Sequence, residues 1–137
     1  MSCAGCKEVG MIVGIGTDLA EVPRIQKSID RYGDRFLSRI YTEAEIAYAK
    51  RKANAAERFA ARFAAKEAGM KALGTGLRNG ITWRDFEVIN EPSGRPGLRL
   101  YGAAFEIAAR LGARRISLSL THTAELAMAV VVLEDGP

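Results

Sequence analysis

An acidic and a basic side chain, Glu67 and Lys71, stand four residues apart in an alanine-rich segment. Because that segment is typical of one uninterrupted helix, both side chains point to the same helical face. Asp18 comes just after the apolar run from Met11 to Gly16, a pattern that predicts a strand whose end delivers a second carboxylate. Two carboxylates and a lysine together suit the binding of a hard divalent cation and of a phosphate-bearing substrate.

One strand and several helices in the first half of the chain must position Asp18, Glu67 and Lys71. Helices are expected from about Pro23 to Tyr32, around Phe36 to Ile40, from Thr42 to about Arg51, and from Asn54 to Leu73. Thr42 and Glu45 have the spacing of a capping box, and Gly74 is the expected left-handed stop of the long helix. Phe59, Phe63 and Met70 give that helix an apolar stripe that faces the core.

The second half changes to short strands around one helix. Strands are expected at Ile81–Trp83, Phe86–Ile89, Leu98–Tyr101, Arg115–Thr121 and Leu126–Glu134, with a helix at Gly102–Leu111. The last strand is apolar throughout, so we expect it in the centre of a sheet. The sequence therefore predicts an α+β fold in a single domain, with one long central helix packed on a small, mainly antiparallel sheet.

Length and composition exclude several classes of protein. A chain of 137 residues fits one domain, which we assign to 11–137, preceded by an extension over 1–10. The longest apolar run has eight residues, far short of the roughly 20 that span a bilayer, so we expect no membrane segment.

The extension over 1–10 is too poor in apolar residues for a secretory signal, and we expect a cytoplasmic protein. Its Cys3 and Cys6 form a C-x-x-C pair, but a zinc site needs two further ligands, so a loose extension is the favoured interpretation.

The net charge of +4 is concentrated in the first half of the chain. The segment 21–71 holds twelve Lys or Arg against seven Asp or Glu. Such a surface attracts phosphates or an acidic protein partner, although an ordinary solvated face would have the same composition.

Three further motifs have competing interpretations. Gly14 and Gly16 form a G-x-G, but Leu19 stands where a dinucleotide fingerprint needs its third glycine, which argues against a Rossmann site. The loop Gly74, Thr75 and Gly76 fits either a helix-ending turn or backbone contact with a phosphate. His122 is expected in the loop between the last two strands, where contact with a ligand is favoured over base catalysis.

The chain resembles a known family through two separated signatures. One is G-I-G-T-D over Gly14 to Asp18, and the other is F-A-A-K-E-A-G-M-K-A over Phe63 to Ala72. Together they resemble the paired signature of the phosphopantetheinyl transferases. The D-L-A-E-V-P-R-I segment, the A-L-G-T-G run and the S-L-T-H-T ending resemble more closely the small bacterial branch, the holo-acyl-carrier-protein synthase family. The likeness covers Met11 to about Glu134 and implies the phosphopantetheinyl transferase-like fold.

The resemblance implies a reaction and roles for the residues. The reaction moves the 4'-phosphopantetheine group of coenzyme A onto a serine of acyl carrier protein, in fatty acid biosynthesis, and releases adenosine 3',5'-bisphosphate. Asp18 and Glu67 would hold Mg²⁺. Glu67 would take the serine proton directly or through a metal-bound water, and Lys71 would stabilise or protonate the departing phosphate. Lys66 and Arg62 would help to hold phosphates, although a surface ion pair is an equal alternative for Arg62.

The same resemblance extends to the remaining binding surfaces. The loop Gly74, Thr75 and Gly76, together with Thr121 and His122, would line the coenzyme A cleft, and the turn around Pro96 would border the adenine. Small members of the family are homotrimers whose sites lie between subunits. Their acidic carrier protein docks on a basic helix, where Arg24 matches the family's contact, and Arg31 and Arg35 are candidates by location.

A basic module that binds RNA or another polyanion is the alternative from a different class. Such modules interleave aromatic with basic residues so that bases can stack. Here Phe59 and Phe63 follow the apolar stripe of a helix instead. The sequence therefore favours the enzyme and predicts no nucleic-acid partner.

Overall fold

The computed structural model describes residues 10–136 and confirms the α+β class. The N-terminal half holds β1 (Ile12–Glu21), α1 (Val22–Tyr32), α2 (Asp34–Ile40), α3 (Glu43–Lys50) and α4 (Ala55–Leu73). The C-terminal half holds η1 (Trp83–Asp85), β2 (Phe86–Asn90), β3 (Pro96–Leu100), α5 (Gly102–Leu111), β4 (Arg115–His122) and β5 (Leu126–Glu134). The C-x-x-C motif of Cys3 and Cys6 lies outside the described residues.

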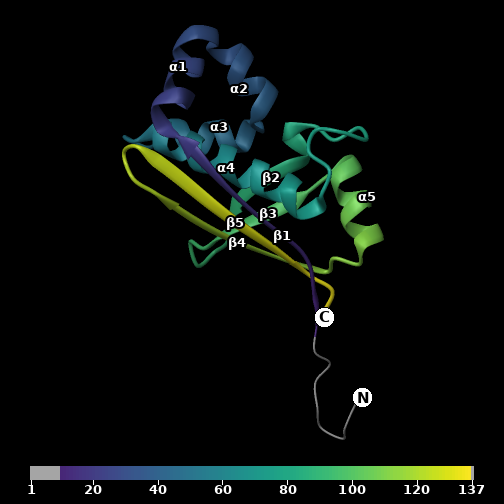
Figure 1. Cartoon of the computed structure of the whole chain (residues 1–137). Helices are drawn as coiled ribbons and strands as arrows, with labels where there is room; N and C mark the ends of the chain where they lie inside the picture. The colour runs from purple at the N-terminus through teal and green to yellow at the C-terminus, as the bar shows by residue number, and fades with distance from the viewer. Residues whose placement is uncertain (1–9, 137) are drawn as a thin grey trace, which may run out of the picture.

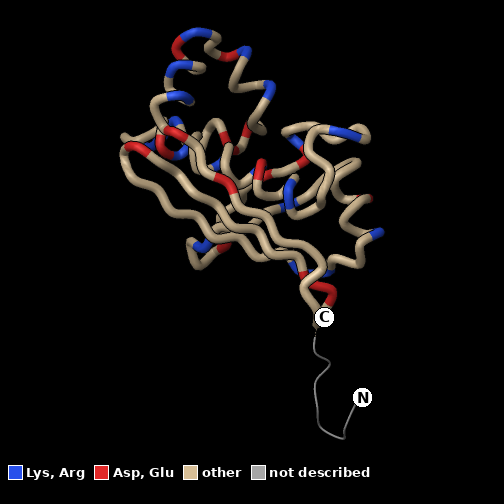
Figure 2. The backbone as a smooth tube through the Cα atoms, in the orientation of Figure 1, with Lys and Arg blue, Asp and Glu red and all other residues tan. Residues whose placement is uncertain are grey.

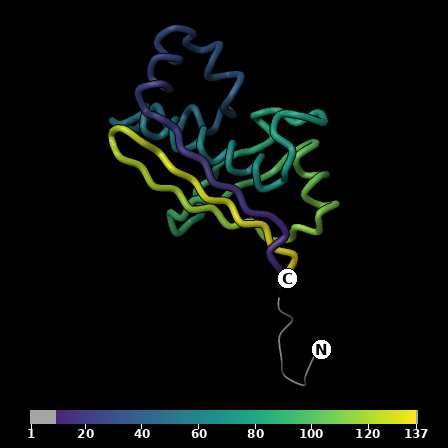
Figure 3. The backbone as a smooth tube through the Cα atoms, in the orientation of Figure 1, coloured from purple at the N-terminus to yellow at the C-terminus, as the bar shows by residue number. Residues whose placement is uncertain are grey.

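Three long strands form an antiparallel sheet in the order β1-β5-β4. They lie side by side along the molecule, with the first and last strands of the chain as neighbours (Figure 3). The prediction that Leu126–Glu134 is the central strand is confirmed. The first strand is longer than predicted, so Asp18 does not stand at its end but in its interior, opposite Ala129.

The long helix α4 packs directly on β1, and the two elements are in contact along much of their length (Figure 1). Gly14 and Gly16 allow this approach, because a Cβ atom on Gly16 would overlap the carbonyl oxygen of Ala68, and one on Gly14 would overlap that of Ala72. The G-x-G of β1 therefore serves helix packing. Alanines on α4 complete a contact between small residues on both sides.

Two local signals at helix ends are confirmed. The side chain of Thr42 accepts a hydrogen bond from the Glu45 backbone amide, and the Glu45 carboxylate accepts one from the Thr42 amide. This reciprocal pair starts α3 at the predicted place. Gly74 ends α4 in the left-handed conformation with φ of 77°, where a residue with a side chain would be strained.

A second, two-stranded sheet of β2 and β3 lies on another part of α4 and contacts β4. The predicted strand at Ile81–Trp83 is wrong. Thr82 and Asp85 hydrogen-bond to each other, Thr82 donating from its amide to the Asp85 carboxylate at 3.3 Å, and this cap begins the short 3₁₀ helix η1. The antiparallel strands are thus divided between two small sheets that share α4 as their common support.

The buried core gathers around α4, whose alanines and Phe59 pack beneath both sheets. Among residues 10–136, no helix combines the length and the apolar character that crossing a membrane requires.

Replacement of Gly16 by alanine tests the close packing of β1 and α4. The added Cβ would meet backbone atoms of α4, so the two elements must separate, and we expect Gly16→Ala to lower the free energy of unfolding by about 1–3 kcal/mol. The measurement is the urea midpoint at a fixed chain concentration. Gly97→Ala in β3 is the matched control, because its added Cβ would lie no closer than 3.4 Å to its neighbours. Equal losses in both variants would contradict this account.

Candidate active site

Asp18 and Lys71 form a direct ion pair between β1 and α4. The Lys71 Nζ donates to Asp18 Oδ1 at 3.0 Å and to the Thr17 carbonyl at 3.1 Å. The Lys71 side chain is half-exposed, whereas 15% of the Asp18 side chain is exposed. The pair therefore joins a nearly buried carboxylate to an ammonium that solvent and substrates can reach.

Glu67 lies close enough to both of these groups to feel their charges. Partial burial and the negative charge of Asp18 raise the pKa of Glu67, and Lys71 lowers it in part. The hydrogen bond to Asp18 and the charge of that carboxylate raise the pKa of Lys71, so the ammonium keeps its charge at neutral pH. The structure therefore brings Glu67 and Lys71 of α4 together with Asp18 of β1, and the roles expected of these residues stay predictions.

The carboxylate ligands of this site suit a hard cation that keeps some of its coordination positions open. Two carboxylates held in mutual repulsion are relieved by a divalent ion, and hard cations prefer oxygen ligands. Within the described range of 10–136, no three or more His, Cys, Asp or Glu side chains gather in a group that could hold a metal ion. Any ion between Asp18 and Glu67 would therefore have to complete its coordination with water or with the oxygens of a substrate.

A separate pocket of about 180 Å³ lies at the other edge of the sheet. Its lining includes the basic side chains Arg58, Arg62 and His122, the aromatic ring of Tyr48, and the β2–β3 turn with Asn90, Gly94 and Pro96. The guanidinium of Arg62 lies 4.3 Å from the centre of the Tyr48 ring. Its Nε is buried and has no hydrogen-bond partner among the described residues, which leaves a donor to be satisfied at this pocket.

The two neighbours in the predicted T-H-T motif face different sides of the sheet. His122 is the last residue of β4, and its Nδ1 lies 3.0 Å from Glu57 Oε1 on α4, at the Arg62 pocket. Thr121 precedes it in the same strand and is exposed on the opposite face, since successive strand residues alternate. One chain therefore does not bring these two side chains to a common pocket.

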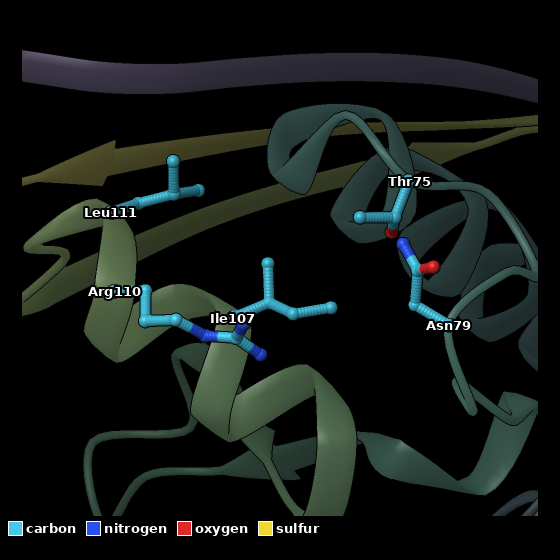
Figure 4. Close-up of a pocket in the computed structure, with 5 residues that line it drawn as sticks. All are labelled: Thr75, Asn79, Ile107, Arg110 and Leu111. Carbon is cyan, nitrogen blue, oxygen red and sulfur yellow. The ribbon is translucent and has the colours of Figure 1, made fainter.

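The loop after α4 borders a third hollow. Gly74 and Gly76 both have positive φ, and Thr75 between them lines a space of about 450 Å³. Figure 4 shows Thr75 and Asn79 on one side of this space and Ile107, Arg110 and Leu111 of α5 on the other. The interpretation of Gly74 as a helix-ending turn is confirmed, and contact of this loop with a phosphate stays a prediction.

Lys66 does not fit the expectation that it contacts a phosphate. Its side chain is fully buried, and its Nζ donates to Glu45 Oε1 at 2.7 Å, to the Trp83 carbonyl at 3.3 Å and to the Phe86 carbonyl. All three protons of the ammonium are thus directed at protein oxygens. Lys66 stands one residue before Glu67, and this single step turns it about 100° around the helix, into the core.

Basic residues gather on α1 and α2, at one end of the molecule (Figure 2). Arg24 is exposed and lies 3.5 Å from Glu21, a weak surface pair that leaves the guanidinium accessible. A surface hollow of about 390 Å³ follows on α1 and α2, lined by Tyr32, Arg35, Phe36 and Arg39. This end of the molecule therefore offers positive charge with some apolar surface.

The aromatic residues of α4 are not available for stacking on bases. Phe59 is buried, and Phe63 stacks on Trp83 with ring centres 4.9 Å apart. This arrangement agrees with the sequence-based argument against an RNA-binding module.

Sequence reasoning missed Glu45, Tyr48 and Arg58 as neighbours of the functional groups. Glu45 carried a local signal, the capping box, but nothing in the sequence indicated that its carboxylate also meets Lys66. Tyr48 reaches the Arg62 pocket through the packing of α3 on α4, whereas Arg58 stands four residues before Arg62 on α4, a spacing from which the sequence could have indicated it.

Comparison with protein families gives one match over most of the chain. The family model described as the 4'-phosphopantetheinyl transferase superfamily matches residues 14–131. A holo-[acyl-carrier-protein] synthase of Solibacter usitatus is 64% identical over 125 residues, which cover 91% of this chain and all of the relative. The same enzyme of Koribacter versatilis is 62% identical with the same coverage.

Solved structures give the same result. The holo-[acyl-carrier-protein] synthase of Neisseria meningitidis is 35% identical and superposes with a TM-score of 0.80 over 90% of this chain and 98% of its own. A Bacillus anthracis holo-(acyl-carrier-protein) synthase in complex with coenzyme A (3',5'-ADP) is 40% identical, with a TM-score of 0.75 and coverage of 92% and 99%. A Helicobacter pylori enzyme in complex with coenzyme A is 32% identical, with a TM-score of 0.76 and coverage of 87% and 98%.

The raised pKa of Glu67 predicts a pH-dependent gain in stability when its charge is removed. Without metal, the native protein binds the proton of the Glu67 carboxyl more tightly than the unfolded chain does. The contribution of Glu67 to stability is therefore present at low pH and is lost as the pH rises through the pKa of the folded state. Glu67→Gln imitates the protonated form. We expect the variant to have the higher thermal midpoint at pH 7, with a difference that disappears below about pH 4. Glu106→Gln, at an exposed carboxylate of α5, is the control. A Glu67→Gln midpoint equal to or below that of the parent protein at pH 7 would contradict the electrostatic account.

Proposed function

The chain belongs to the 4'-phosphopantetheinyl transferase superfamily, and we propose that its reaction depends on a divalent cation held by Asp18 and Glu67. The protein is an enzyme that transfers the 4'-phosphopantetheine group of coenzyme A to a serine of acyl carrier protein and releases adenosine 3',5'-bisphosphate. The observation that supports the proposed roles best is the meeting of Asp18, Glu67 and Lys71 at the contact of α4 with β1.

The residues present fit a magnesium ion. Asp18 and Glu67 supply two anionic oxygen ligands, and their mutual repulsion is the feature that a cation would relieve. A bound Mg²⁺ would neutralise charge on the pyrophosphate of coenzyme A. Lys71, the cation that pairs with Asp18, has a half-exposed side chain.

The remaining chemistry is assigned to side chains of α4. The serine oxygen of the carrier attacks the phosphorus that bears pantetheine, a new P–O bond forms, and the bond to the nucleotide's phosphate breaks. The serine hydroxyl must lose a proton, and Glu67, whose pKa is raised, is suited to accept it. Lys71 carries a positive charge beside Asp18 and stabilises the negative charge that develops on the departing phosphate.

The Arg62 pocket is the proposed seat of the nucleotide end of coenzyme A. Arg62 offers an unsatisfied Nε there, and Arg58 and His122 add further donors at the same opening. Guanidinium groups bind phosphates with directed hydrogen bonds. The turn at Pro96 borders the same pocket, which supports the proposal that this turn lies beside the adenine. The loop from Gly74 to Gly76 is proposed to contact the pantetheine side of the molecule, and Thr121 is proposed to do so from a neighbouring subunit.

A homotrimer with shared sites is proposed from two features of the sheet. Asp18 lies on β1 and His122 on β4, which are the opposite edges of the three-stranded sheet, so one chain separates the two parts of the site. The outer face of the sheet is open and apolar, with exposed fractions of 63% at Ile15 and Leu19, 46% at Leu126 and 38% at Met128. An apolar face of this kind suits burial against further copies of the chain.

The basic end formed by α1 and α2 is the proposed docking surface for acyl carrier protein. Arg24 is exposed there, and Arg31 and Arg35 lie on the same two helices. Positive charge favours encounter with an acidic partner, and the neighbouring Phe36 adds apolar contact. The cytoplasmic location and the boundaries of the domain stay predictions.

The proposed cation site is tested by the mass of the product. Apo-carrier protein incubated with the enzyme, coenzyme A and Mg²⁺ should gain the phosphopantetheine mass, and a chelator should prevent the gain. We expect Asp18→Ala and Glu67→Ala each to lower the transfer rate at least about a hundredfold while the far-UV circular dichroism stays unchanged. Glu106→Ala is the control at an exposed carboxylate away from the site. Full activity in either site variant would refute the assignment.

The shared site is tested by mixing two inactive variants. Glu67→Ala removes one part of the site and Arg62→Gln the other, so each homotrimer should be inactive. If each site takes Glu67 from one subunit and Arg62 from its neighbour, co-expression should restore about a quarter of wild-type activity, because chance pairing makes one interface in four intact. A mixture no more active than its separate components would exclude a site divided between subunits.

A further inference from the structure

Lys66 and Glu45 form a fully buried ion pair, and Lys66 stands between Arg62 and Glu67 along α4. Both side chains have an exposed fraction of 0%, and the Nζ–Oε1 distance is 2.7 Å. Burial lowers the pKa of Lys66, and the adjacent Glu45 carboxylate opposes this change. The ammonium is surrounded by protein oxygens from η1, β2 and α3.

The Glu45 carboxylate joins three elements of the fold. Its Oε1 accepts hydrogen bonds from the Thr42 amide at 2.9 Å and from Lys66, and its Oε2 accepts one from the Val88 amide at 2.9 Å. These donors belong to the start of α3, the middle of α4 and strand β2. The carboxylate therefore ties α4 to two neighbours through fixed, directed bonds.

The face of α4 that meets β1 is poorly suited to fix the rotation of the helix. The helix contacts β1 through alanines opposite glycines, and such small side chains interlock less than large ones. A slip of one residue would turn the helix by about 100° and move it by about 1.5 Å. That slip would carry Glu67 away from Asp18 and Arg62 away from its pocket.

Stability alone does not account for this pair. The desolvation of two buried charges costs roughly as much as their attraction returns, and apolar residues of similar volume often stabilise a protein equally well. The pair instead fixes the rotation of α4, because Lys66 bonds to atoms of three elements while Glu67 and Lys71 face β1.

We propose that Glu45 and Lys66 are positioning residues, which fix the rotation of α4 so that Glu67 and Lys71 face Asp18 while Arg62 faces the nucleotide pocket. This inference rests on the proposed function for the identity of those two parts of the site. Lys66 acts through the helix and does not touch the substrate.

The double variant Glu45→Gln/Lys66→Met tests this role, together with its two single variants. Each single variant leaves one buried charge without its partner, so we expect a strong fall in the thermal midpoint. The double variant removes both charges, and its midpoint should recover most of that loss. Its dissociation constant for Mn²⁺, measured by calorimetry without coenzyme A, should nevertheless stay about 10–100 times higher than that of the parent protein.

A second measurement follows the rotation of α4 without any metal. Trp83 is the only tryptophan of the chain, and its ring stacks on Phe63 of α4 with an angle of 26° between the planes. We expect the near-UV circular dichroism of Trp83 to change in the double variant at a temperature where it is folded. Leu118→Ala, a buried change in β4 at a residue outside this network of hydrogen bonds, is the control that loses stability but keeps both the Mn²⁺ affinity and the Trp83 signal.

The outcomes separate this inference from the proposed function. An unchanged Trp83 signal in the double variant, with parental Mn²⁺ affinity, overturns the positioning role. A Lys66→Met variant that raises only the KM for coenzyme A would instead make Lys66 a phosphate ligand. If the parent protein binds Mn²⁺ no better than Asp18→Ala, the proposed cation site fails. Because Lys66 also bonds directly to the Trp83 carbonyl, the rotation of α4 in a crystal structure of the double variant then decides whether the pair positions the helix.

Discussion

The close contact of α4 with β1 is the constraint on which the rest of this structure depends. Backbone meets backbone there because Gly14 and Gly16 carry no side chains and Ala68 and Ala72 carry small ones. This contact brings a helix residue, Glu67, beside a strand residue, Asp18, although 49 positions separate them in the sequence. A bulkier interface would hold the two carboxylates too far apart to share one ion.

Because this contact is made by small residues, the rotation of α4 has to be fixed by other contacts in the fold. The contact with β1 holds α4 closely but fixes its rotation weakly, and the buried bonds of Lys66 to Glu45, Trp83 and Phe86 fix that rotation from the other side of the helix. Different faces of α4 therefore contact different parts of the molecule. One face meets the proposed cation site and another the buried network of Lys66, while Arg62 faces the pocket at β4.

Local signals in the sequence predicted most elements, because they depend on neighbours along the chain. The capping box at Thr42 and the left-handed glycine at position 74 are of this kind, and both are confirmed. The strand expected at Ile81–Trp83 was wrong because the cap between Thr82 and Asp85 outweighed the apolar pattern. The buried place of Lys66 was not predictable, because its partners come from three elements distant in the sequence. Motif likeness identified it as a site residue, but only packing shows which way it points.

The central claim is that Asp18 and Glu67 bind one cation between them. Crystals grown with Mn²⁺ and coenzyme A allow a direct test, because the anomalous scattering of manganese locates the ion without reference to any assumed role. The account predicts one strong anomalous peak within coordination distance of both carboxylates, about 2.0–2.3 Å from an oxygen of each. A peak bound to other residues, or none beside this pair in crystals that contain the coenzyme, would contradict it.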